Sequence, residues 1–148
     1  MSLKKDNYKS SDKKIMNFAI NLAENNKYIT GTNPSVGCVI VKNNKILSFA
    51  TTNYGGRPHA ESIALNKNRS NKGTSLYSTL EPCSHHGVTP PCTNAIIKNK
   101  VKKVYYSIED KDLRTFNKTK KILKSKKIVA ISGLQKQKVK SLYSEYNY

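Results

Sequence analysis

The sequence of 148 residues contains no tryptophan, only three cysteines and no long hydrophobic run. Three cysteines cannot form a complete set of internal disulfides, which argues against a disulfide-stabilised secreted domain and favours a reducing compartment. No stretch approaches the roughly 20 apolar residues that a membrane span needs, so we expect a cytoplasmic protein. At this length a single domain over residues 1–148 is the simplest organisation, with residues 1–11 as a flexible, lysine-rich N-terminus.

Acidic residues and arginines are also scarce. The chain has 9 Asp and Glu against 27 Lys and Arg, a formal net charge of +18, yet its only arginines are Arg57, Arg69 and Arg114. A groove that reads bases or clamps phosphates favours Arg, which can donate two parallel hydrogen bonds. Because lysine and asparagine are spread along the whole chain, the charge does not indicate a nucleic-acid substrate. The basic field can still attract an anionic metabolite and raise its association rate.

Residue types that bind metals are concentrated between residues 57 and 92. A His-x-Glu triplet, His59 to Glu61, is followed twenty residues later by a Glu-Pro-Cys triplet that ends at Cys83, and a further cysteine stands at Cys92. A structural zinc site usually has four protein ligands, whereas a catalytic site has three and leaves one position for water. Only His59, Cys83 and Cys92 fit together as a ligand set. The pattern therefore predicts a catalytic Zn²⁺ with one open position.

Glu61 is the candidate catalytic residue. In zinc-dependent base deaminases a His-x-Glu triplet precedes Pro-Cys-x-x-Cys, and the Glu is a general acid and base rather than a ligand. Here the cysteine pair is wider, with eight residues between Cys83 and Cys92. We expect the inserted segment to form a loop over the open zinc position. The alternative for Glu61 is a solvated carboxylate at a helix start, which the helix dipole would also favour.

The other cysteine and the two remaining histidines have different expected roles. Cys38 lies in an apolar strand without a ligand-type neighbour, so we interpret it as a core residue. His85 and His86 could compete as zinc ligands, but we expect them to lie in the inserted loop.

Three separated blocks of the chain closely resemble, in order, the deaminase domain of riboflavin biosynthesis. They are Asn33-Pro34-Ser35-Val36-Gly37-Cys38, then Gly56-Arg57-Pro58-His59-Ala60-Glu61, then Thr79-Leu80-Glu81-Pro82-Cys83-Ser84-His85-His86-Gly87 with Thr89-Pro90-Pro91-Cys92. The resemblance covers about residues 15–133. It implies a zinc-dependent hydrolase that deaminates a diaminopyrimidinone carrying ribosylamine 5′-phosphate, a small-molecule substrate, to the pyrimidinedione.

The resemblance also implies substrate contacts, position by position. Asn33 is expected to contact the pyrimidine or the ribose, His85 the ribose phosphate end, and Asp110 the ribosyl region.

Three positions depart from residues that are common in that family. Thr52 stands where many members have His, Val88 where Lys or Arg is usual, and Asp112 where Asn is frequent. The change at Val88 removes an expected phosphate partner.

The periodicity of apolar residues predicts alternating helices and strands. Helices are expected over 12–24, 61–65, 92–99, 115–125 and 135–146, and strands over 36–41, 45–52, 75–79, 103–108 and 128–131. Such alternation after an opening hairpin indicates a mainly parallel sheet covered on both faces. The resemblance implies the cytidine deaminase-like fold, a three-layer α/β/α sandwich with a mixed, mainly parallel five-stranded sheet.

Other functions and partners remain open at this point. A tRNA adenosine deaminase, or another nucleobase deaminase, would suit the basic charge, but the wide cysteine spacing and the block from Asn33 to Gly37 argue against it. A non-catalytic interaction subunit that keeps zinc for folding would have no use for Glu61. In many relatives a reductase domain follows the deaminase. The sequence is compatible with a separate reductase partner, with the first half of a longer chain, and with a homo-oligomer.

Overall fold

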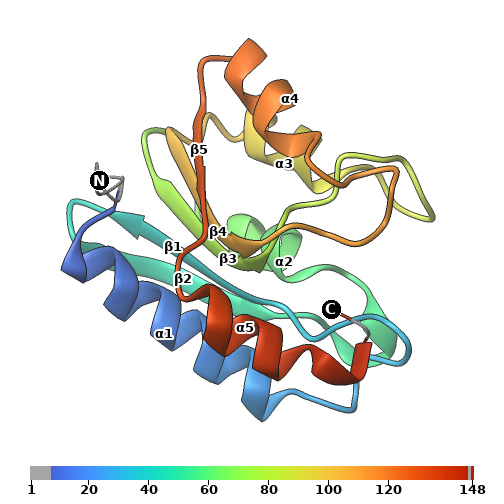
Figure 1. Ribbon diagram of the computed structural model, residues 1–148. Coiled ribbons are helices and arrows are strands. Elements are labelled where there is room, and N and C mark those ends of the chain that lie inside the picture. The colour runs from blue at the N-terminus through green and yellow to red at the C-terminus, as the bar shows by residue number, and fades with distance from the viewer. Residues whose placement is uncertain (1–7, 147) are drawn as a thin grey trace, which may run out of the picture.

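A five-stranded sheet forms the centre of the computed structural model, which describes residues 8–146 and 148 (Figure 1). The strands are β1 Gly37–Lys42, β2 Lys45–Thr51, β3 Ser75–Leu80, β4 Lys103–Ile108 and β5 Val129–Ser132. They lie in the order β2-β1-β3-β4-β5. β1 is antiparallel to both neighbours, whereas β3, β4 and β5 are parallel, so β1 alone opposes the common direction. The prediction of a mixed, mainly parallel five-stranded sheet is confirmed.

Helices cover both faces of this sheet, as predicted. α1 (Ser10–Asn25) and α5 (Lys136–Leu142) pack on one face, and α2 (Ala60–Asn66), α3 (Cys92–Lys98) and α4 (Thr119–Ser125) lie on the other (Figure 1). Two short 3₁₀ helices, Tyr54–Gly56 and Ser144–Tyr146, complete the regular structure. The result is the expected three-layer α/β/α sandwich.

Local sequence explains the opening hairpin and its contact with α1. Asn43 and Asn44 have φ of 51° and 62°, the left-handed conformation that a two-residue hairpin turn requires and that Asn tolerates. At the start of β1, a Cβ on Gly37 would lie 1.9 Å from the carbonyl oxygen of Ala19. Only glycine therefore permits this close approach of α1 to the sheet.

The hydrophobic core lies between the sheet and its two helical layers. Its largest fully buried side chains include Tyr106, Tyr143 and Met16. Cys38 is also fully buried in this core, and burial raises the pKa of its thiol well above the ordinary value. The interpretation of Cys38 as a packing residue is confirmed.

The N-terminal boundary differs from the prediction. Residues 1–7 of the expected flexible segment 1–11 lie outside the described residues, but Ser10 and Ser11 already belong to α1. The backbone amide of Lys9 donates to the Asp12 carboxylate at 2.7 Å, which satisfies a polar group at the helix start. The helix therefore begins two residues before the predicted start.

Two C-terminal helices are shorter than predicted. α4 begins at Thr119 rather than at residue 115, because Asn117 has a positive φ of 58° and the carboxylate of Glu81 accepts the amides of Asn117 and Thr119. Phe116, which the predicted helix over 115–125 includes, precedes α4 and is 45 % exposed. α5 ends at Leu142 rather than at residue 146, and a 3₁₀ turn continues the chain.

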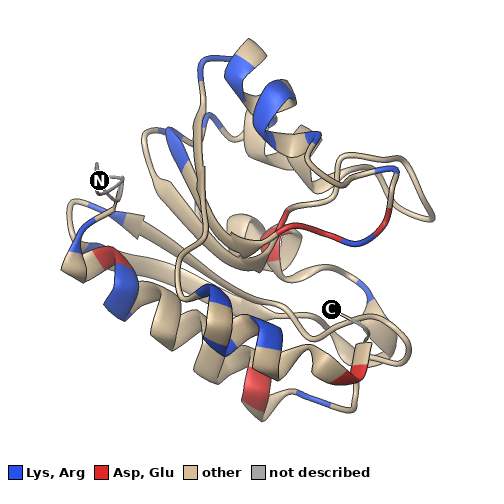
Figure 2. Cartoon of the chain, in the orientation of Figure 1, with Lys and Arg blue, Asp and Glu red and all other residues tan. Residues whose placement is uncertain are grey.

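Charge is distributed unevenly over the fold. Basic residues are spread over α1, α4, α5 and the loops, whereas three acidic residues, Glu109, Asp110 and Asp112, lie together in the segment that follows β4 (Figure 2). Within the described part of the chain, no helix combines the length and the apolar character needed to cross a bilayer.

Candidate metal centre and substrate cavity

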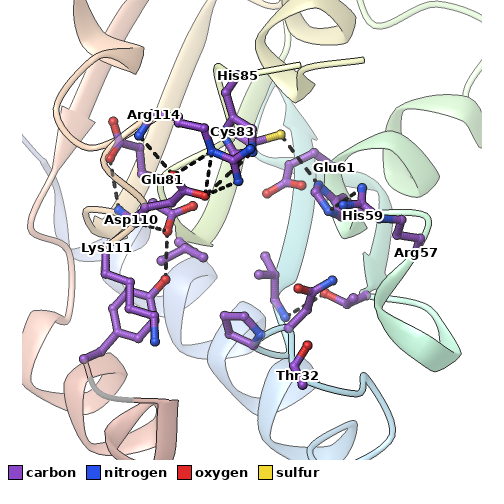
Figure 3. Close-up of a pocket in the computed structure, with 17 residues that line it drawn as sticks. Thr32, Arg57, His59, Glu61, Glu81, Cys83, His85, Asp110, Lys111 and Arg114 are labelled. Atoms are coloured by element: carbon purple, nitrogen blue, oxygen red, sulfur yellow. Dashed lines mark hydrogen bonds and ion pairs between the residues drawn. The ribbon is translucent and has the colours of Figure 1, made fainter. Parts of the chain in front are cut away.

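A cavity of about 470 Å³ opens where β3 and β4 end, close to the start of α2. In an open α/β sheet the carboxyl ends of the strands are the usual place for a ligand site. Six of the seven residues singled out from the sequence line this cavity (Figure 3): Asn33, His59, Glu61, Cys83, His85 and Asp110. The seventh, Cys92, does not line the cavity but contacts both His59 and Cys83.

The three predicted zinc ligands meet at one point. His59 Nδ1 lies 3.7 Å from Cys83 Sγ and 3.4 Å from Cys92 Sγ, and all three ligand atoms lie within 4.8 Å of one another. A nitrogen and a sulfur bound to one tetrahedral zinc at its usual bond lengths must be about 3.6 Å apart. The donor set and its spacing therefore fit Zn²⁺, with a fourth position left for water or substrate.

Two helix starts and a strand end hold these ligands in place. His59 immediately precedes α2, Cys92 is the first residue of α3, and Cys83 follows β3. The amide of Cys92 donates to Cys83 Sγ at 3.2 Å. Hydrogen bonds from Cys92 and then from His59 outweigh burial and lower the pKa of Cys83 to about 4, which favours the thiolate that a metal requires. The site is therefore divided between two helix starts, and Cys83 is supplied from the end of β3.

Glu61 lies beside the ligands in the first turn of α2 and is only 4 % exposed. Its Oε1 accepts a hydrogen bond of 2.9 Å from the hydroxyl of Ser78 on β3, and its Oε2 lies 3.4 Å from Cys92 Sγ. Burial raises the pKa of Glu61 above its ordinary value. The carboxylate is therefore fixed next to the metal position, and it is not the solvated helix-start residue of the alternative interpretation.

Asn33 is held on one wall of the cavity by its neighbours. The side-chain amide of Asn33 donates to the carbonyl oxygen of Gly56 at 3.3 Å, and the backbone carbonyl of Asn33 accepts the hydroxyl of Thr30 at 2.6 Å. Gly56 has φ of 96°, and a Cβ there would lie 2.5 Å from the Asn33 amide. Glycine at position 56 is therefore needed for Asn33 to keep its place.

The opposite wall is the segment that follows β4, and Glu81 fastens it. The buried Glu81 carboxylate accepts the backbone amides of Asp110, Asn117 and Thr119 at 3.0 to 3.3 Å. His85 lines the same wall, where its Nδ1 lies 2.7 Å from the hydroxyl of Thr115. The structure thus brings the predicted contacts His85 and Asp110 into one cavity.

Comparison with known proteins identifies the family. Residues 9–108 match the family described as the cytidine and deoxycytidylate deaminase zinc-binding region. This chain belongs to that deaminase family. Because the matched region is the family's zinc-binding region and the His59, Cys83 and Cys92 donor set fits the ion, the metal of this deaminase is zinc.

Relatives of this deaminase carry names from riboflavin biosynthesis. The chain is 46 % identical over 100 residues to riboflavin biosynthesis protein RibD of Aquifex aeolicus, covering 67 % of this chain and 28 % of that protein. It is 41 % identical to the diaminohydroxyphosphoribosylamino-pyrimidine deaminase of Buchnera aphidicola, covering 83 % of this chain and 84 % of that protein. The deaminase therefore spans less than a third of the first relative but most of the second.

A solved structure shows the same fold. The crystal structure of a diaminohydroxyphosphoribosylaminopyrimidine deaminase/5-amino-6-(5-phosphoribosylamino)uracil reductase from Thermotoga maritima superimposes with a TM-score of 0.85 at 34 % identity. The match covers 93 % of this chain and 40 % of that one. The predicted family and fold are confirmed.

Several cavity residues of this deaminase were not found from the sequence. Lys111, Arg114 and Tyr148 line the cavity, yet no motif pointed to them. Ser78, the partner of Glu61, could have been found only from its place on the strand that leads to the Glu-Pro-Cys triplet. Thr52 has a structural role, because its hydroxyl accepts the amide of Val36 at 2.9 Å.

The inserted loop contributes only some of its residues to the cavity. His85 lines the cavity, but the adjacent His86 is exposed and lies outside the three-residue ligand group. Val88 is 82 % exposed and does not line the cavity. Arg57 secures the loop, because its guanidinium donates to the hydroxyl of Thr89 at 2.8 Å.

Proposed function

We propose that this chain is the zinc-dependent hydrolase that deaminates a diaminopyrimidinone carrying ribosylamine 5′-phosphate in riboflavin biosynthesis. The observation that carries the proposal is Glu61, a buried carboxylate held by Ser78 beside three zinc-type ligands and facing the cavity. A zinc site that served folding alone would not need an open cavity or a carboxylate fixed next to it. The names of the Aquifex and Buchnera relatives support the choice of pathway and substrate.

The proposed reaction replaces a ring amine with a carbonyl oxygen, so one water is consumed and one ammonia is released. When bound, zinc supplies a Lewis acid that promotes ionisation of water at neutral pH. Glu61 accepts a proton from the attacking water and returns it to the amine, which then leaves as ammonia. One carboxylate therefore acts first as a base and then as an acid. Ser78 keeps it in place through both steps.

The substrate would lie across the cavity with its ring near the metal. Asn33 offers a side-chain amide at the wall nearest the ring or ribose, and Asp110 on the opposite wall offers a carboxylate to the ribosyl hydroxyls. His85, on the same wall, would contact the phosphate end. These roles extend the sequence-based assignment, and the cavity lining supports each of them.

A different cation would serve the phosphate in place of the residue lost at Val88. Arg114 lines the cavity, and its guanidinium donates three hydrogen bonds to the carboxylate of Asp112 at 2.6 to 3.2 Å. That carboxylate also lies 3.9 Å from His85 Nε2. We assign Arg114 as the phosphate-binding cation, held at the rim by Asp112 and beside the histidine expected at the phosphate end.

The cellular setting is part of the proposal. None of the three cysteines forms a disulfide, which supports a reducing cytoplasm. The Thermotoga relative carries a reductase in its name, and we assign reduction of the ribosyl group in this pathway to such a reductase, as a separate partner or in one chain with the deaminase.

Ammonia release tests the proposal. The zinc-loaded protein should deaminate the ribosylaminopyrimidine phosphate and should show negligible activity on cytidine and on tRNA adenosine. Faster turnover of tRNA than of the pyrimidine would favour the rival tRNA deaminase. Normal zinc content without activity on any of the three would favour the non-catalytic subunit.

A further inference from the structure

Two tyrosines, Tyr143 and Tyr148, connect the core to the cavity wall. Tyr143 is fully buried, and its hydroxyl donates to the carbonyl of Ser35 at 2.7 Å and lies 2.6 Å from the hydroxyl of Thr79. The ring of Tyr148 packs 5.6 Å from the ring of Tyr143 and lines the substrate cavity. The packing of its ring against the buried Tyr143 thus places Tyr148 beside the cavity.

Two consecutive residues of the opposite wall hold this tyrosine. The hydroxyl of Tyr148 donates to Asp110 Oδ1 at 2.9 Å. The ammonium group of Lys111 lies 5.2 Å from the centre of the Tyr148 ring and also donates to the carbonyl of Tyr146. The hydrogen bond between Asp110 and Tyr148 joins residues that are 38 positions apart in the sequence.

The two carboxylate oxygens of Asp110 differ in their hydrogen-bond partners. Oδ1 accepts both the Tyr148 hydroxyl and the backbone amide of Asp112, at 2.9 and 3.0 Å. Within residues 8–146 and 148, no donor is bonded to Oδ2. A carboxylate oxygen at a cavity wall that lacks a protein donor is free to accept a hydroxyl from a ligand.

We propose that Tyr148 is a positioning residue, which occupies Asp110 Oδ1 and so directs Oδ2 toward a hydroxyl of the substrate's ribosyl group. The inference rests on the proposed function, because it assigns a ribosyl hydroxyl as the ligand of Asp110. Tyr148 remains a donor throughout the working pH range, since burial and the Asp110 carboxylate both raise the pKa of its hydroxyl. Without this bond only the Asp112 amide would hold Oδ1, and the plane of the carboxylate could turn away from the ribosyl hydroxyl.

The test uses Tyr148→Phe, which keeps the ring against Tyr143 and Lys111 but removes the hydroxyl. With the ribosylated substrate, KM should rise about fivefold, the effect of losing one hydrogen bond, while kcat stays within about twofold. With the same pyrimidine lacking the ribosyl phosphate, KM and kcat should not change. The matched control is Tyr146→Phe, because the hydroxyl of Tyr146 makes no hydrogen bond among the described residues and its carbonyl is retained.

A double-mutant cycle with Asp110 separates positioning from a general loss of structure. In an Asp110→Ala background, Tyr148→Phe should add less than about a twofold change in KM, because the group it positions is gone. Zinc content and melting temperature should match the parent. Equal effects in both backgrounds, or an equal effect on the substrate without ribose, would overturn the inference while leaving deamination by the parent intact. An inactive parent would overturn the proposed function and the inference together.

Discussion

Glu61 and Arg114 line the same cavity, but their surroundings differ sharply. Glu61 is 4 % exposed and is held by Ser78 and the zinc ligands, whereas 63 % of the Arg114 side chain is exposed and its partner is another charged rim residue, Asp112. A buried charge needs partners in fixed positions, since an unpaired one is costly. An exposed ion pair is screened by water and salt and contributes little. The metal end of the cavity, formed by the zinc ligands and Glu61, should therefore tolerate almost no substitution. Substitutions at the rim, formed by Asp112 and Arg114, should change the affinity for the substrate only gradually.

Removal of a zinc ligand should have the largest effect. His59→Ala, Cys83→Ser and Cys92→Ser should each lose most of the roughly one zinc per chain and all measurable deamination, because two ligands cannot hold the ion tightly. Elemental analysis of the purified variants measures the loss. Cys38→Ser is the matched control and should retain full zinc, since Cys38 lies in the core. Full retention in any two of the ligand variants would exclude this site.

Replacement of Glu61 should leave the metal in place but remove the proton carrier. Glu61→Gln keeps the size of the side chain and its bond to Ser78, so zinc content should not change. Single-turnover ammonia release at saturating substrate should fall by about 10⁴-fold, the upper end for a general acid and base, because one residue serves both proton transfers. A rate within tenfold of the parent at normal zinc content would exclude Glu61 as the proton carrier.

Substitutions at the rim should give smaller effects of opposite sign. Arg114→Ala should raise KM for the phosphorylated substrate about tenfold, because it removes a charged donor and leaves Asp112 facing the phosphate. Asp112→Asn should instead lower KM by a few-fold, since it frees Arg114 and removes a negative charge. Steady-state kinetics at low and high salt measure both changes, which should shrink as salt rises.

Two comparisons make this rim prediction specific. With the substrate lacking its phosphate, neither variant should change KM. Val88→Lys should change KM for the phosphorylated substrate by less than about fivefold, the limit for an exposed ion pair, because position 88 is exposed and does not line the cavity. A large improvement from Val88→Lys, combined with no effect of Arg114→Ala, would show that the phosphate lies under the inserted loop instead.

Local sequence was sufficient to predict the metal end. The ligands His59, Cys83 and Cys92 and the adjacent Glu61 stand next to helix starts and a strand end, where short-range patterns decide the geometry. The hairpin at residues 43–44 was predictable for the same reason, because paired asparagines favour its turn. Local pattern also gave the order of the strands and helices.

The rim could not be predicted in this way, since long-range contacts shape it. The late start of α4 depends on Glu81 capturing the amides of Asn117 and Thr119, which lie 36 and 38 residues further along the chain. The bond between Tyr148 and Asp110 spans a similar separation. Neither the periodicity of apolar residues nor a short motif predicts such long-range pairings.

The carboxylate of Glu81 has a consequence for protein engineering. It grips the segment after β4 through three backbone amides, and backbone amides are present whatever side chains the segment carries. Side chains at positions 111 to 114 and 116 could thus be exchanged as a cassette without loosening the attachment, provided that no proline removes a donor at position 110, 117 or 119. Thr115 has to be kept, because its buried hydroxyl accepts the amide of Ser84 and contacts His85. Libraries directed at new pyrimidine derivatives could vary this cassette alone, with the metal centre carried unchanged from one design to the next.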